Sequence, residues 1–256
     1  MLVVHGTGGG YDQGILMARM LVGDGFRFIT PSRFGYLRTP LPADASAEAQ
    51  ADVQACLLDA LNISKVAVVG VSAGAPPSMQ FALRYPDRIS ALVLIVPAAW
   101  APPAPQAERK FPVPTAVYDA LFGSDFLMWL MTKFALPSLE SAFGVSSEVL
   151  DRLDPAEKEE LSELVHALQP ISLRNAGIRN DRAVVDSLVR YPLENITVPT
   201  LVISAADDTV APSGWGKYTA ENIPGANFTL LESGGHFLAG QHTRVRALVS
   251  EFIKKH

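Results

Sequence analysis

The stretch Val66–Gly74, VAVVGVSAG, decides the fold of this chain. An apolar run leads into a G-x-S-x-G pentapeptide, and a helical pattern begins a few residues later. A serine on a sharp strand-to-helix turn has crowded backbone angles, and glycine two positions to either side removes Cβ atoms that would collide. Such a turn lifts the hydroxyl above the sheet and places the next N–H at a helix N-terminus. We interpret Ser72 as a nucleophile; the alternative is a glycine-rich turn with an uninvolved serine.

Short apolar runs alternate with helical patterns on both sides of this stretch. We expect strands at Leu2–Val4, Phe26–Ile29, Lys65–Val71, Ala91–Val96, Thr200–Ser204 and Phe228–Leu231, and helices at Asp12–Leu21, Ala45–Leu61, Ala73–Tyr85, Ser213–Asn222 and Thr243–Lys255. In the second helix, Val53, Leu57 and Leu61 form an apolar stripe. The alternation predicts an α/β fold with a mainly parallel, doubly wound sheet that carries helices on both faces.

The alternation is interrupted between residues 97 and 191, where the pattern is helical without strands. Asp154-Pro155-Ala156-Glu157 has the features of a capping box, and the helix that it begins should run to about Leu168. We interpret residues 97–191 as a helical lid inserted into a core made of residues 1–96 and 192–256. A lid is favoured because ligands of open α/β sheets bind at the carboxyl ends of the strands; the alternative is additional structural helices packed on the core.

The second chemical motif is HGTGGG, residues 5–10, directly after the first strand. A glycine-rich turn here can aim backbone N–H groups at a developing oxyanion. We expect the donor to be Thr7 or Gly8, paired with the N–H of Ala73. A phosphate-binding loop is rejected because the sequence has neither a G-x-x-x-x-G-K-[ST] pattern nor a G-x-G-x-x-G followed by a helix and a distal acid. His5 is expected to brace the loop rather than to act as a base.

A base and an acid follow later in the chain. Gly234-Gly235-His236-Phe237 comes after the last strand, where glycines allow His236 to approach the nucleophile. Asp207-Asp208 comes after the strand before it, and an acid there would fix the imidazole tautomer. We favour Asp208, with Asp207 as its rival. The order Ser72, Asp208, His236 is the Ser…Asp…His order of one triad-bearing fold. The other histidines, His166, His242 and His256, lack such a setting.

With these motifs the chain resembles the α/β-hydrolase superfamily, in its lidded branch. The resemblance also includes the run RYPDRISALVL, residues 84–94, and the Asp-x-x-x-Pro of residues 208–212. It implies that Ser72 is the nucleophile, His236 the base and Asp208 the orienting acid. It also implies that Ser32–Tyr36 lines the pocket mouth and holds the oxyanion loop. Members of the family usually have two further strands before that loop. Without them the strand at Phe26–Ile29 would be an apolar sheet edge, which predicts poor solubility or a homodimer.

The predicted lid is rich in apolar side chains and poor in charge between residues 111 and 138. These side chains are Phe111, Tyr118, Phe122, Phe126, Met128, Trp129, Met131 and Phe134. They predict an apolar substrate pocket, although many of them could simply join the lid to the core. We expect Phe34, Phe126, Trp129 and Phe237 to contact the substrate. The polar run from Arg174 to Asp181 is interpreted as a solvated face that could also reach a substrate carboxylate.

These features predict a serine hydrolase that cleaves a small or medium, mainly apolar carboxylic ester. A C–C bond hydrolase or a lactonase could use the same triad, but a hydrolase of acidic substrates needs a basic pocket residue, for which the region of Arg174 and Arg179 is the candidate. A non-catalytic ligand-binding protein of the same fold is the remaining alternative. Since fold alone does not fix chemistry, the substrate stays open.

Composition excludes other classes of partner. The net charge of −5 argues against nucleic acid, because phosphate binding requires a basic face. The longest uncharged stretches are broken by glycine and proline, so we expect no membrane span. A single cysteine, Cys56, excludes an intramolecular disulfide and a cysteine-based zinc cage. We expect a cytoplasmic protein that acts on a small molecule without metal or cofactor.

Overall fold

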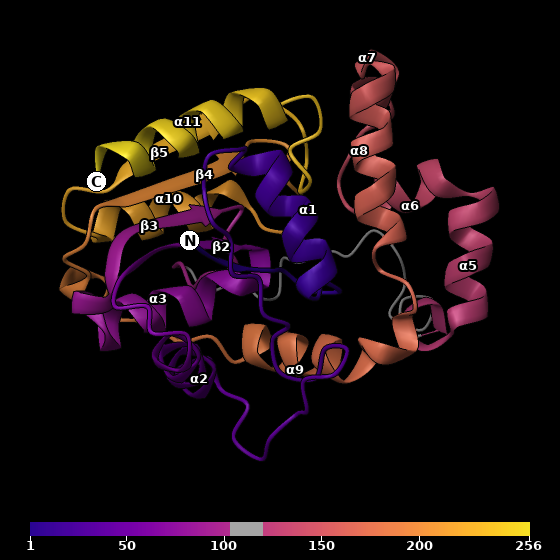
Figure 1. Cartoon of the computed structure of the whole chain (residues 1–256). Coiled ribbons are helices and arrows are strands. Elements are labelled where there is room, and N and C mark those ends of the chain that lie inside the picture. Colours follow the sequence, from indigo (N-terminus) through magenta and orange to yellow (C-terminus); the bar gives the residue numbers. More distant parts are fainter. Residues whose placement is uncertain (103–119) are drawn as a thin grey trace.

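A computed structural model describes residues 1–102 and 120–256 of the chain. In this part of the chain one sheet contains five parallel strands, in the spatial order in which they occur in the sequence (Figure 1). They are β1 (Leu2–Val4), β2 (Val66–Val71), β3 (Ile89–Ile95), β4 (Thr200–Ala205) and β5 (Asn227–Leu231). All four neighbouring pairs are parallel, with Val4 opposite Gly70 and Gly70 opposite Leu94. The α/β fold with a parallel sheet is confirmed.

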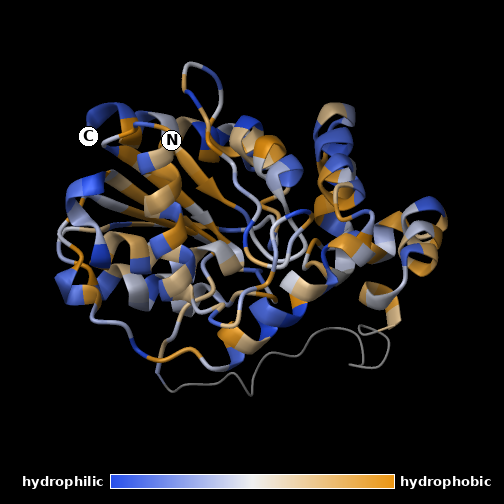
Figure 2. Ribbon diagram, turned by 60° about the horizontal axis from the view of Figure 1, so that its bottom comes forward, coloured by the Kyte–Doolittle hydropathy of each residue, from blue (hydrophilic) through white to orange (hydrophobic). Residues whose placement is uncertain are grey.

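Helices cover both faces of the sheet because each strand sends alternate side chains to opposite sides. The core elements are α1 (Tyr11–Leu21), α2 (Ala47–Ala60), η1 (Ser72–Gly74), α3 (Ala75–Arg84), η2 (Pro86–Arg88), α10 (Ser213–Asn222) and α11 (His242–Lys255). On one face Val3 and Val69 pack in a cluster with α1 and α11. On the other, Leu2 and Val68 pack with α2, α3 and α10. Apolar residues accordingly concentrate in the strands and on the inner helix faces (Figure 2).

The predicted apolar stripe of α2 is wrong. Val53 is 47% exposed and Leu61 is 44% exposed, whereas the buried face contains Ala51, Ala55 and Leu58. This face also has three- and four-residue spacing, and it combines two alanines with the fully buried Leu58. The alanines allow close packing of α2, and Val53 and Leu61 are left on the outside. Hydrophobicity alone does not show which of the two faces packs inward.

The predicted strand at Phe26–Ile29 is also wrong. Only Ile29 forms a β-bridge, to Leu2. Two backbone hydrogen bonds accompany it, from Val3 N–H to Ile29 O at 2.9 Å and from Ile29 N–H to Met1 O at 2.8 Å. Residues 26–28 form no further ladder pair with β1. The apolar pattern located the neighbour of β1 but overestimated its regularity.

Between β3 and β4 the described residues form helices. They are α5 (Asp125–Phe134), α6 (Leu136–Ala142), α7 (Ser147–Arg152), α8 (Pro155–His166), η4 (Ile171–Leu173), α9 (Asn175–Asp186) and η5 (Leu193–Asn195). The capping box at the start of α8 is confirmed, with Asp154 and Glu157 each accepting from the other's N–H. Phe111 and Tyr118 lie outside the described residues. None of the described helices combines the length and the apolarity needed to cross a bilayer.

Candidate active site

Ser72 lies in the turn between β2 and α3 with a φ of +52°, a left-handed conformation that is unfavourable for residues other than glycine. The two flanking glycines allow this turn. A Cβ on Gly70 would lie 2.5 Å from the Ser78 hydroxyl oxygen, and one on Gly74 would overlap the backbone oxygen of Val4. The Ser72 carbonyl accepts from Ala98 N–H at 3.1 Å, so the segment after β3 also holds the turn.

A chain of hydrogen bonds runs from Ser72 to Asp208. His236 Nε2 lies 2.9 Å from Ser72 Oγ, and His236 Nδ1 lies 2.8 Å from Asp208 Oδ2. A carboxylate can only accept, so Nδ1 carries the proton and the Nε2 lone pair receives the Ser72 hydroxyl. The side chains are well enclosed, with exposed fractions of 9% for His236 and 0% for Asp208. The structure therefore brings the three predicted residues together from the ends of β2, β4 and β5.

The two neighbouring aspartates bind different groups. Asp208 directs Oδ2 at the imidazole, while its Oδ1 accepts from Val210 N–H at 2.8 Å and Ala211 N–H at 2.9 Å. Asp207 instead accepts from Gly234 N–H at 3.0 Å and Gly235 N–H at 2.9 Å. Asp208 thus contacts His236 directly, and Asp207 fixes the glycine turn from which His236 projects.

The glycine-rich loop after β1 lies against the same turn. A Cβ on Gly6 would be 3.0 Å from Ser72 Cβ, so glycine permits the close approach. Gly8 N–H donates to the Tyr36 hydroxyl at 3.2 Å. Thr7 N–H donates to none of the described residues. Of the two candidate oxyanion donors in this loop, Gly8 is therefore engaged by Tyr36, whereas Thr7 is free to bind a ligand.

His5 and Arg33 brace this loop. His5 Nδ1 donates to Gly6 O at 2.7 Å, and Nε2 accepts from Arg33 N–H at 3.0 Å. Arg33 Nε donates in turn to His5 O at 2.8 Å. Burial and the nearby positive charge of Arg33 lower the pKa of His5 well below its ordinary value. His5 is therefore a neutral structural group with both nitrogens satisfied.

A buried carboxylate on α9 binds the same region. Asp181 accepts from both terminal nitrogens of Arg33 at 2.6 Å, from the Tyr36 hydroxyl at 2.5 Å and from Thr7 Oγ1 at 3.0 Å. Burial, with the negative charge of Asp181, raises the pKa of Tyr36 well above its ordinary value, so the phenol remains a donor. Sequence reasoning treated Asp181 as part of a solvated run. The missed signal is its helical spacing with Gly177, Ile178 and Val185, which form the buried face of α9.

Arg174 is fully buried and is not available to a substrate. Its terminal nitrogens donate to Gly9 O, to Asp12 Oδ2 at 2.6 Å and to Gln169 O at 3.2 Å. Arg179, the other candidate in this run, is exposed on α9. Both buried arginines near the glycine-rich loop after β1, Arg33 and Arg174, are therefore paired with aspartates of this chain.

The four predicted substrate-contacting aromatic residues lie in different places. Phe34 is buried, and its N–H donates to Gln50 Oε1 at 2.8 Å. The Phe237 ring follows His236 and lies 4.9 Å from the Phe143 ring, between their centroids. Phe126 and Trp129 are 65% and 47% exposed on α5, which lies away from the sheet in Figure 1. The structure thus does not bring Phe126 and Trp129 to Ser72.

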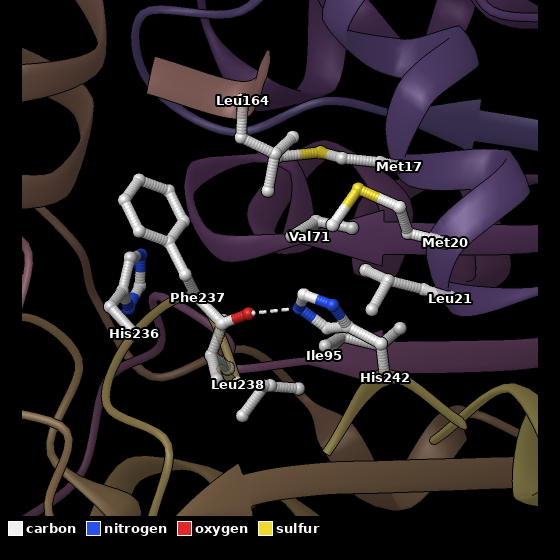
Figure 3. Close-up of a pocket in the computed structure, with 11 residues that line it drawn as sticks. Met17, Met20, Leu21, Val71, Ile95, Leu164, His236, Phe237, Leu238 and His242 are labelled. Carbon is white, nitrogen blue, oxygen red and sulfur yellow. Dashed lines mark hydrogen bonds between the residues drawn. The ribbon is translucent and has the colours of Figure 1, made fainter. Parts of the chain in front are cut away.

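A small apolar cavity adjoins the loop that carries His236 (Figure 3). Its volume is about 20 Å³, and residues of α1, the ends of β2 and β3, α8 and the loop after β5 line it. One water molecule would fill it, so it is a packing gap rather than a substrate pocket. Two residues with left-handed backbones, Val96 at φ +42° and Leu238 at φ +54°, lie in its wall. His242 Nε2 donates to Phe237 O at 2.8 Å beside it.

Comparisons with known proteins identify the family of this chain. A family model described as alpha/beta hydrolase fold matches residues 1–243. An alpha/beta hydrolase fold protein from Nakamurella multipartita has a similar solved structure, with a TM-score of 0.85 and 29% identity; the match covers 99% of this chain and 91% of that one.

Two relatives have more specific names. A putative carbamate hydrolase, RutD, from Klebsiella pneumoniae is 29% identical, and the match covers 77% of this chain and 68% of the relative. The 2-hydroxy-6-oxononadienedioate/2-hydroxy-6-oxononatrienedioate hydrolase of Paraburkholderia xenovorans is 26% identical; here 99% of this chain and 86% of the relative are covered. Both relatives are named as hydrolases, and their names refer to different substrates.

Proposed function

Because the chain belongs to the α/β hydrolase fold family, we propose that it is a serine hydrolase that cleaves a small or medium, mainly apolar carboxylic ester. The observation that carries this proposal is the hydrogen-bonded series Asp208, His236, Ser72 at a strained strand-to-helix turn. A serine held in this way can lose its proton to the imidazole as it attacks a carbonyl.

The reaction has two steps. His236 Nε2 takes the Ser72 proton while Oγ bonds to the ester carbon, and the N–H groups of Thr7 and Ala73 bind the resulting oxyanion. His236 then protonates the departing alcohol, which leaves an acyl-Ser72. Water, deprotonated by His236, attacks the acyl group, and the acid is released as Ser72 recovers its proton. Asp208 keeps Nδ1 protonated and stabilises the imidazolium in each step.

Charge pairing favours a neutral substrate. A carboxylate-bearing substrate requires a cation in the site, but Arg33 and Arg174 are already paired with Asp181 and Asp12. Breaking the buried Arg33–Asp181 pair would leave a charge without a partner, at a cost of about 3–5 kcal/mol. The Asp12 side chain is 38% exposed, but moving it would leave the buried Arg174 without its carboxylate. An uncharged ester needs no such rearrangement.

We assign the helices between residues 97 and 191 the role of a lid. Their contacts with the loop after β5 support this role. The rings of Phe143 and Phe237 are in contact, and a Cβ on Gly235 would overlap the Gly144 carbonyl oxygen. Residues of the segment thus pack against the neighbours of His236, where a lid could exclude water during the reaction.

Other acyl-type substrates are the second candidate. The relative from Paraburkholderia xenovorans aligns with nearly the whole chain and is named for dicarboxylates, which favours a C–C bond hydrolase. The relative from Klebsiella pneumoniae is named for carbamates, which present the same kind of electrophilic carbonyl. Lactones suit the same mechanism. A non-catalytic binding protein would not need the hydrogen-bonded series. The cytoplasm is the proposed compartment, in agreement with the single exposed cysteine, Cys56.

A panel of neutral esters, lactones, carbamates and acidic diketones tests the proposal. We expect the highest kcat/KM on a short or medium neutral ester, and loss of hydrolysis above background in Ser72→Ala with substrate binding retained. Asp52→Asn, which alters an exposed ion pair on α2, is the control and should match the wild type. Full activity of Ser72→Ala on the preferred ester would disprove the assignment of the nucleophile.

A further inference from the structure

We propose that Asp181 is a positioning residue that holds the Thr7 N–H in place for the oxyanion, and that the inserted helices thereby complete the site. This inference rests on the proposed function. It assigns a task to a carboxylate that neither touches the reacting atoms nor belongs to the hydrogen-bonded series at Ser72.

The first argument is connectivity. One carboxylate oxygen, Asp181 Oδ2, accepts from the hydroxyls of Thr7 and Tyr36 and from one nitrogen of Arg33. The Thr7 hydroxyl and the Thr7 N–H belong to the same residue, so fixing the side chain restricts the orientation of the peptide. The Asp181 side chain is buried, which makes the bonds strong and their geometry well defined.

The second argument is the choice of donor. Tyr36 uses its hydroxyl proton on Asp181 and its oxygen to accept from Gly8 N–H. The N–H of Gly8 is therefore already bonded to Tyr36. Of the two candidate donors in this loop, Thr7 N–H is then the one that can bind the oxyanion together with Ala73 N–H. Asp181 therefore acts on both residues. Its bond to Tyr36 holds the phenol that binds Gly8 N–H, and its bond to the Thr7 hydroxyl orients Thr7 N–H.

The third argument is charge. A free carboxylate close to the oxyanion would oppose the negative charge that forms there. Arg33 cancels that charge with two bonds of 2.6 Å to Asp181. The pair can therefore orient Thr7 without an electrostatic penalty. Arg33 also donates to His5 O, so the pair is tied to the start of the same loop.

The test uses substitutions on the two sides of the hydrogen bond between Thr7 and Asp181. Thr7→Val removes the hydroxyl and keeps the shape and the N–H, whereas Thr7→Ser keeps the hydroxyl and serves as the matched control. Asp181→Asn removes the acceptor charge. Each variant is assayed for kcat and KM on a p-nitrophenyl ester and on the corresponding thionoester. Sulfur is a poor hydrogen-bond acceptor, so the thionoester gains little from the oxyanion donors.

We expect Thr7→Val to lower kcat on the ester by roughly 10-fold to 10²-fold with little change in KM, because the lost interaction acts mainly in the transition state. The ester-to-thionoester ratio of kcat/KM should fall with it. Thr7→Ser should restore both values. The double variant Thr7→Val/Asp181→Asn should lose less than the sum of the two single losses, because both substitutions remove the same bond between Asp181 and Thr7.

The inference would be overturned if Thr7→Val kept the wild-type kcat and the wild-type ester-to-thionoester ratio of kcat/KM. Additive losses of kcat in the double variant would overturn it as well. Asp181→Asn leaves Arg33 unpaired and could prevent folding, in which case Thr7→Val and Thr7→Ser alone decide. The rate at which a fluorophosphonate modifies Ser72 separates this inference from the proposed function. If the wild type is neither modified nor active on esters, the proposed function fails. If the wild type reacts and Thr7→Val reacts equally fast, only the role of Asp181 fails.

Discussion

Asp207 and Asp208 show how one position changes the task of a side chain. Both follow β4, but one side chain binds the imidazole of His236 and the other binds the glycine turn before it. The sequence could place an acid at this corner because strand ends meet there, but it could not choose between two adjacent aspartates. That choice depends on which direction each side chain takes from the turn.

Substituting the two aspartates separates their roles. Asp208→Asn should lower kcat by roughly 10⁴-fold with the fold intact, because an amide can stabilise the wrong imidazole tautomer. Asp207→Asn weakens two hydrogen bonds to a charged acceptor and should mainly lower the melting temperature, with a smaller loss of kcat. Steady-state kinetics and thermal unfolding of both variants provide the measurement. If Asp207→Asn had the larger effect on kcat, the assignments of the two acids would be reversed.

His5 makes stability depend on pH. Its folded pKa lies well below the ordinary value of 6.5, so the unfolded chain takes up a proton first on acidification. The contribution of neutral His5 to the free energy of unfolding is therefore complete above about pH 6.5. It is lost as the pH falls through the pKa that His5 has in the folded chain. Protonation of His5 Nε2 would also break its hydrogen bond with Arg33 N–H, because two N–H groups would then face each other.

Denaturant unfolding of the wild type and His5→Gln across this range tests the effect. The free energy of unfolding of the wild type should decrease more steeply below about pH 6.5 than that of the variant. Parallel curves would show that His5 does not contribute to the pH dependence.

At the scale of elements, α9 and the loop of residues 33–36 meet through two glycines. Gly177 N–H donates to Gly35 O at 2.9 Å, and a Cβ on Gly177 would overlap the Tyr36 ring. No larger residue fits between the helix and the ring. This contact places Asp181, one turn further along α9, beside Arg33 and Tyr36.

Gly177→Ala should push α9 away from Tyr36. We expect a loss of about 1–3 kcal/mol in the free energy of unfolding, as for overpacking elsewhere, together with a reduced kcat. Gly214→Ala is the matched control, because Gly214 lies in α10 with no atom near its added Cβ. It should be neutral or stabilising by up to about 1 kcal/mol. Equal stability of the two variants would contradict the close contact.

The sequence predicted those structural features best that have a strong local pattern. Continuous apolar runs located β1 to β5 correctly, and the capping box located α8, because both signals are set by neighbouring residues. The inner face of α2 and the irregular segment before Ile29 depend on packing partners and were predicted wrongly. Chain order anticipated the meeting of Ser72, Asp208 and His236. The burial of Asp181 is visible in its helical spacing on α9, but its hydrogen bonds to Thr7, Arg33 and Tyr36 are not, since no motif links these residues in the sequence.

At the scale of the whole molecule, the short contact between β1 and Ile29 lies at one edge of the sheet that the described residues form. An edge with unpaired backbone groups can bind a second chain. We predict that two copies associate along residues 26–29. Sedimentation velocity over a range of concentrations should show a reversible dimer that weakens when Phe28 is replaced by lysine. A monomer at all concentrations would contradict the predicted dimer.

The whole molecule serves to bring three distant side chains to one turn, and covalent modification of that turn tests this claim most directly. The wild type and His236→Gln are treated with a fluorophosphonate and mapped by peptide mass spectrometry. We predict a single adduct on Ser72 in the wild type and a rate at least about 10²-fold lower in His236→Gln, because the unassisted serine is a weak nucleophile. An unmodified Ser72 in the folded wild type, or equal rates in the two proteins, would contradict the account.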